Sequence, residues 1–104
     1  MIFIETPTFT EDVKQLLSDE CYGEFQLYMC GNPHAGDVIR GTNGLRKVRW
    51  AGDGGGKRSG VRIIYYHISS AFEIRLILIY RKGIKDDLSP AEKKVLCELN
   101  KRWK

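Results

Sequence analysis

The spacing of hydrophobic positions along the chain changes after residue 33. Up to that point they recur every three or four residues, which is typical of helices with one buried face. This spacing predicts a helix with Thr10 as its N-cap and a second helix from Ser18 or Asp19, with Gly31 just past its end. Residues 2–5 precede them as a short apolar strand. The expected apolar faces of the two helices comprise Val13, Leu16, Leu17, Tyr22, Phe25 and Met29.

Beyond a loop that contains several glycines, apolar and polar residues alternate as in β-strands. The pattern predicts strands at residues 45–50, 61–68 and 72–80, with a glycine-rich connection at 51–60. Residues 76–79 read Leu-Ile-Leu-Ile, and such an unbroken apolar run indicates burial on both faces. The third of these strands is therefore expected in the interior of the sheet.

The final helix has the clearest start signal in the chain. Ser89 and Glu92 have the spacing of a capping box, and Pro90 stands at the first helical position. The resulting order, β-α-α-β-β-β-α, predicts one α+β domain over residues 1–104, with a small, mostly antiparallel sheet and helices packed on one face. The apolar face expected for the final helix comprises Val95, Leu96, Leu99 and Trp103.

Charge is distributed unevenly along the chain. Residues 1–43 carry two basic and seven acidic side chains, residues 44–85 carry ten basic and two acidic ones, and residues 86–104 carry five basic and four acidic ones. The formal net charge of +4 therefore conceals a strongly basic middle segment. A basic segment within an otherwise balanced domain indicates a surface that faces a polyanion, with a solvated, charge-rich sheet face as the alternative.

Cysteine usage and hydropathy indicate the compartment. The odd set Cys21, Cys30 and Cys97 has no repeated spacing, which argues against a disulfide framework and against a zinc site. The N-terminus lacks the pattern of a signal peptide, and no apolar run has the length of a membrane span. We expect a cytoplasmic protein that has no membrane partner and needs neither a metal nor a cofactor.

Strand periodicity places several basic side chains on one face of the predicted sheet. Lys47 and Arg49 share a face of the first hairpin strand. Arg62 lies near the start of the next strand, and Tyr80 and Lys82 lie at the end of the third. If these strands are neighbours, the five side chains converge as candidate catalytic residues. The RNA-binding candidates around them are Arg46, Lys57, Arg58, Tyr66, Arg81 and Lys85.

A surface of cations and aromatic rings suits RNA, because cations bind phosphates and aromatic rings stack on bases. Cleavage also needs a base for the 2′-hydroxyl and an acid for the leaving 5′-oxygen. His34 lies in a loop and His67 in a strand, which argues against a two-histidine ribonuclease. A lysine crowded by other cations loses its proton more readily, and arginine clamps phosphate. Trp50 and Trp103 are expected in the hydrophobic core.

A combined pattern of glycines, basic residues and β-branched residues extends over about residues 32–100. This pattern resembles the RelE/HigB-like toxin family of bacterial type II toxin–antitoxin systems. The resemblance implies a compact α+β fold and ribosome-dependent cleavage of messenger RNA in the ribosomal A site. The segments that carry it are residues 32–33, 36–39, 41–49, 56–66, 79–83 and 87–89.

The resemblance also implies roles for particular residues. Lys47 and Arg49 match the paired basic residues of the family's first hairpin strand. Arg62 matches the arginine that follows the glycine at the next strand, and Lys82 lies near the basic residue that ends the last strand. Relatives often place a tyrosine or histidine near the C-terminus for stacking or proton transfer, whereas this chain has a lysine-rich helix there. The substitutes for that group are Tyr80, Tyr66 and Lys57.

Partners follow from the same resemblance: the ribosome, messenger RNA and a cognate antitoxin. The antitoxin often has a helix-turn-helix region, so that operator DNA is reached only through the toxin–antitoxin complex. Two other functions stay open at this point. One is a non-catalytic nucleic-acid-binding module, and the other is a toxin of the same family that inhibits a different target such as a topoisomerase.

Overall fold

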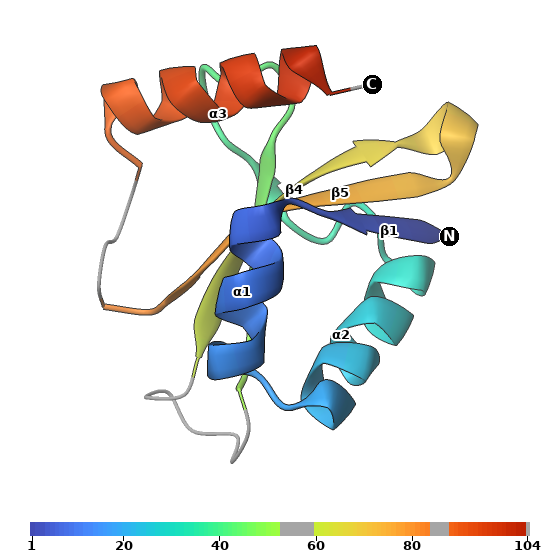
Figure 1. The fold of residues 1–104 in the computed structure, drawn as a ribbon. Coiled ribbons are helices and arrows are strands. Elements are labelled where there is room, and N and C mark those ends of the chain that lie inside the picture. Colours follow the sequence, from blue (N-terminus) through green and yellow to red (C-terminus); the bar gives the residue numbers. More distant parts are fainter. Residues whose placement is uncertain (53–59, 84–87, 104) are drawn as a thin grey trace.

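The computed structural model describes residues 1–52, 60–83 and 88–103, and its elements follow the order expected for an α+β domain (Figure 1). The α+β class and the mostly antiparallel sheet are confirmed. The two-residue strand β2 was not predicted, and a 3₁₀ turn at Ser69–Ala71 joins the strands predicted at 61–68 and 72–80. The elements are β1 (Ile2–Glu5), α1 (Pro7–Leu16), α2 (Asp19–Gly31), β2 (Asp37–Val38), β3 (Arg46–Trp50), β4 (Val61–Ile68), β5 (Glu73–Arg81) and α3 (Pro90–Arg102).

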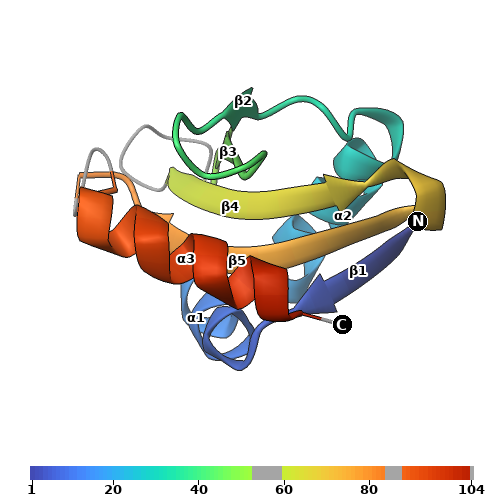
Figure 2. The ribbon, with the colours of Figure 1, turned by 90° about the horizontal axis from the view of Figure 1, so that it is seen from above.

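The sheet has the strand order β1-β5-β4-β3-β2 (Figure 2). β1 pairs with β5 in parallel, and the other neighbouring strands are antiparallel. β5 is hydrogen-bonded to a strand on each side, which confirms its interior place. Strands β3, β4 and β5 therefore lie side by side, as convergence of the basic residues requires.

The first helix begins earlier than the sequence indicated. Thr6, not Thr10, is its N-cap, and its hydroxyl accepts a hydrogen bond from the Phe9 backbone N–H at 3.0 Å. The same hydroxyl donates to the Ile77 carbonyl at 2.9 Å, so the cap also fastens the helix to β5. The prediction overlooked Pro7, which suits the first helical position. Ser18 caps α2 as expected, but that helix includes Gly31.

Two hydrophobic clusters lie on opposite faces of the sheet, so α1 and α2 share one face as predicted, whereas α3 packs on the other face. Neighbouring residues of β4 show this, because Ile63 belongs to the cluster of α1 and α2 whereas Ile64 belongs to the other cluster. Leu96 and Trp103 of α3 pack against the second cluster. Val95 and Leu99 were expected to share that buried face, but they are 65% and 42% exposed. The helix is rotated so that its Leu96 side faces the sheet.

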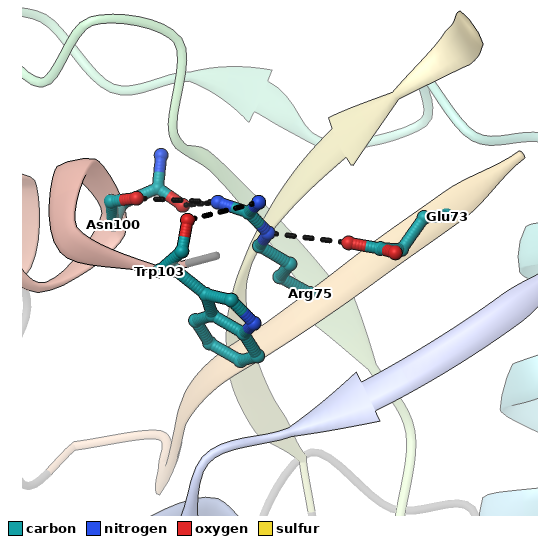
Figure 3. A network of polar contacts seen from close by, with 4 residues as sticks. All are labelled: Glu73, Arg75, Asn100 and Trp103. Carbon is teal, nitrogen blue, oxygen red and sulfur yellow. Dashed lines mark hydrogen bonds and ion pairs between the residues drawn. The ribbon is translucent and has the colours of Figure 1, made fainter. Parts of the chain in front are cut away.

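Both ends of α3 are fixed by polar contacts. The capping box of Ser89 and Glu92 is present as predicted. At the other end Arg75 of β5 donates to the Asn100 carbonyl at 3.2 Å, to its amide oxygen at 3.0 Å, and to the Trp103 carbonyl at 3.4 Å (Figure 3). Arg75 also forms an ion pair with Glu73 at 3.2 Å. Cationic donors suit the free carbonyls at a helix C-terminus.

None of the helices in the described part of the chain has the length and apolar character needed to cross a membrane.

Candidate nucleic-acid interface

The sheet register places Arg49, Arg62 and Tyr80 in one row across β3, β4 and β5. Arg49 is directly opposite Arg62, and Arg62 is directly opposite Tyr80. Directly opposite residues of antiparallel strands have Cβ atoms about 4.5–5.5 Å apart. Lys47 lies two residues from Arg49 on β3 and therefore shares the same face, at a distance of about 6.6 Å along the strand. The structure thus brings four of the five candidate catalytic residues onto one face.

Two arginines directly opposite each other repel unless an anion lies between or beside them. Arg49 is exposed and Arg62 is half-buried. Within residues 1–52, 60–83 and 88–103, no carboxylate forms an ion pair with either guanidinium. The hydrogen bond of Arg62 in this part of the chain goes to the Val61 carbonyl at 3.4 Å. This row is therefore suited to an external anion such as a phosphate.

A groove of about 1060 Å³ adjoins the row at the edge of the sheet. β2 pairs only with Arg46 and Lys47, so the remainder of β3 lines an open edge there. Lys47 and Arg49 line the groove together with Arg40 and Lys93. Sequence reasoning missed the last two because Arg40 lies in the acidic segment 1–43 and Lys93 lies outside the apolar face predicted for the final helix. The groove therefore has cationic side chains from three separate segments and one carboxylate, that of Asp37.

Aromatic rings form one side of this groove. Trp50 and Tyr28 line it, with ring centroids 5.4 Å apart. Trp50 also packs edge-on against the buried Phe25, with ring centroids 5.3 Å apart. Trp50 therefore contacts the hydrophobic core, as expected, and also lines the groove. The buried indole N–H of Trp50 has no hydrogen-bond acceptor in the part of the chain that the structure describes. A groove with both cations and aromatic rings has the two features that single-stranded nucleic acid requires.

Tyr80 and Lys82 differ in exposure although both come from the end of β5. Tyr80 is 7% exposed, belongs to the second hydrophobic cluster and lies directly opposite Arg62 in the sheet register. Lys82 is exposed in the turn after β5, and its backbone N–H donates to the Gly60 carbonyl at 3.0 Å. Lys82 therefore lies at the same end of the sheet as Arg62.

Other predicted RNA-binding residues lie away from the row. Arg46 occupies the opposite face, where its guanidinium donates to the Gly36 carbonyl at 2.7 Å. Strand alternation directs Arg81 to that face too. Tyr66 shares the face of Arg62 but lies four residues further along β4, against Arg75. The candidates Lys57, Arg58 and Lys85 lie outside the described residues.

The two histidines are neighbours, although the sequence suggested that they were separate. His67 Nδ1 lies 3.3 Å from His34 Nε2. Burial and the nearby His34 and Arg46 lower the pKa of His67. The pair is not placed to act on RNA as two separate proton-transfer groups, because a phosphate does not fit between nitrogens in contact. His67 also lies five residues along β4 from Arg62, on the opposite face.

A comparison of the chain with models of known protein families found no match. Among the described residues, no three side chains of His, Cys, Asp or Glu form a group suited to a metal ion.

Proposed function

We propose that this protein is a RelE/HigB-like toxin of a bacterial type II toxin–antitoxin system. It acts in the cytoplasm as a metal-independent endoribonuclease that cleaves messenger RNA in the ribosomal A site and so inhibits translation. The observation that carries the proposal is the cross-strand pair of Arg49 and Arg62, which has no carboxylate partner among the described residues and lies beside a cationic groove.

Charge separation over the molecule supports the same proposal. The helices α1 and α2, on the face opposite the arginine pair, display the exposed acidic residues Glu11, Asp19, Glu20 and Glu24. A polyanion is therefore repelled from the helical face and attracted to the face of the row. Each phosphate that the row and groove bind releases counterions, so RNA binding is expected to weaken steeply with salt.

The chemistry proposed is attack of the RNA 2′-oxygen on the adjacent phosphorus. The bond from phosphorus to the 5′-oxygen breaks, a 2′,3′-cyclic phosphate forms, and the 5′-oxygen leaves with a proton. Arg49 and Arg62 would hold the phosphate and stabilise its added negative charge. Lys47 and Lys82, on either side of the arginines, would exchange the protons. Tyr80 would position Arg62, because its ring is almost fully buried.

A cognate antitoxin would neutralise the protein by covering this basic surface, and operator DNA would be bound only by the toxin–antitoxin complex. The ribosome supplies the remaining contacts in the proposal. Positioning of the message in the A site would add to the electrostatic contribution of the arginines.

Controlled expression in a bacterial host tests the function. Wild type should arrest growth, whereas Arg62→Ala should lose about 10²–10³ in cleavage rate and allow growth. Lys14→Ala is the matched control, because Lys14 is an exposed cation of α1 on the opposite face, and this variant should arrest growth like wild type. Circular dichroism of each variant establishes that it is folded. Equal arrest by wild type and Arg62→Ala would exclude the proposed site.

A further inference from the structure

His34 and His67 approach each other through one ring nitrogen of each side chain. These two nitrogens are 3.3 Å apart, a distance that also admits a long hydrogen bond between the rings. The rings are nearly perpendicular, at 75°, with centroids 4.9 Å apart. The two imidazoles therefore approach each other nitrogen to nitrogen.

The same separation fits two ligands of one tetrahedral metal ion. Two nitrogens bonded to zinc at about 2.0–2.1 Å with a tetrahedral angle lie about 3.3–3.4 Å apart. The ring centroids of such ligands are then about 5 Å apart. Two neighbouring ligands of a square-planar ion such as Cu²⁺ would instead have their nitrogens about 2.9 Å apart. Both distances between His34 and His67 therefore match the tetrahedral ion.

We propose that His34 Nε2 and His67 Nδ1 form a binding site for a tetrahedral divalent cation of the zinc type. This site is independent of the proposed function, because it lies on the opposite face of the sheet from Arg62. No third His, Cys, Asp or Glu among the described residues joins the pair, so water completes the coordination. With only two protein ligands, the bound ion exchanges with solvent.

The backbone around His34 holds this geometry before any ion binds. The buried hydroxyl of Tyr65 donates to the Pro33 carbonyl at 2.8 Å and accepts from the Gly36 backbone N–H at 3.0 Å. Gly36 cannot be replaced without movement, because an added Cβ would lie 2.8 Å from the Lys47 carbonyl oxygen. His34 is therefore carried by a loop that is fastened on both sides to the sheet.

Only neutral imidazole binds a metal, so a nearby cation weakens binding to the pair. Arg46 is the cation that faces the pair, with its guanidinium 3.4 Å from the His34 carbonyl, and it reduces affinity without blocking either nitrogen.

Calorimetric titration of the full chain with zinc chloride tests the site. Wild type should bind a single zinc ion, and His34→Gln and His67→Gln should each weaken binding by more than tenfold. Cys30→Ser is the matched control, because Cys30 is an exposed thiol that could bind zinc on its own, and this variant should bind as wild type does. Zinc binding by both histidine variants with the wild-type dissociation constant would overturn the proposal.

A second measurement needs no variant. Long-range proton–nitrogen spectra of the wild-type chain should show zinc-induced shifts at His34 Nε2 and His67 Nδ1, with the proton of each ring on the other nitrogen. Shifts at only one ring would contradict the two-ligand site. Sedimentation of the same sample should show an unchanged mass. A zinc-dependent dimer would mean that a second copy completes the coordination, which would also contradict the site as proposed.

Discussion

Removal of a single oxygen atom, by the change Tyr65→Phe, tests how the loop before β2 is held. The ring of Tyr65 is fully buried, and its hydroxyl joins the Pro33 carbonyl to the backbone N–H of Gly36, which is also buried. The lost hydrogen bond to Pro33 contributes about 1 kcal/mol, and the unsatisfied N–H of Gly36 costs about 1–3 kcal/mol. We expect the free energy of unfolding to fall by about 2–4 kcal/mol.

Urea unfolding followed by circular dichroism measures this loss. For a domain of this size the corresponding fall in Tm is about 10–20 °C. Tyr28→Phe is the control, since Tyr28 is 42% exposed and its substitution should change stability by less than about 0.5 kcal/mol. Equal stabilities of Tyr65→Phe and wild type would refute the account of the loop.

The same hydroxyl predicts a dependence on alkaline pH. Burial raises the pKa of Tyr65 above its usual value of 10.0. Above that value the unfolded state loses a proton that the folded state keeps, so stability should fall as the pH rises beyond about 10. Tyr65→Phe should show a shallower decline than wild type in urea midpoints measured from pH 9 to 11. Parallel declines would contradict the assignment.

Three further perturbations test other parts of the fold. Arg75→Ala should lower the free energy of unfolding by about 2–4 kcal/mol, because the C-terminus of α3 loses its hydrogen-bond donors and Glu73 loses its ion-pair partner. An unchanged midpoint in urea unfolding would contradict this. Ser89→Ala should cost about 1 kcal/mol in the same assay, and no loss would mean that the capping box is not formed in solution. The pKa of His67 is lower in the folded state than its usual 6.5, so wild-type stability should fall as the pH drops below 6.5. A His67→Gln variant whose stability has the same pH dependence from pH 8 to pH 5 would contradict this.

Local sequence signals predicted much of the fold. β4 has the expected bounds, and the capping box and the interior place of β5 depend on short patterns that tertiary contacts do not override. The start of α1 was misplaced because Thr6 and Thr10 are both good caps. Pro7, at the first helical position, and the contact of Thr6 with Ile77 distinguish them. The rotation of α3 was also missed, since Leu96 and Leu99 are equally apolar and the sheet decides which one is buried.

The candidate site was predictable only where strand alternation applies. Alternation along each strand places Lys47 and Arg49 on one face of β3 and Arg62 on one face of β4. The directly opposite arrangement of the two arginines depends on the pairing register of these strands, which the sequence did not specify. The groove was missed because Arg40 and Lys93 reach it from a loop and from α3. The proximity of His34 to His67 joins residues 33 positions apart through a loop whose path depends on Tyr65.

Cleavage of a defined message on purified ribosomes tests the central claim most directly. Primer extension should show wild-type cleavage within the A-site codon, and Arg49→Ala and Arg62→Ala should each cleave about 10²–10³ times more slowly. A message left intact by the folded wild-type chain, or cut equally fast by the Arg62→Ala variant, would contradict an RNA-cleaving site at the arginine pair.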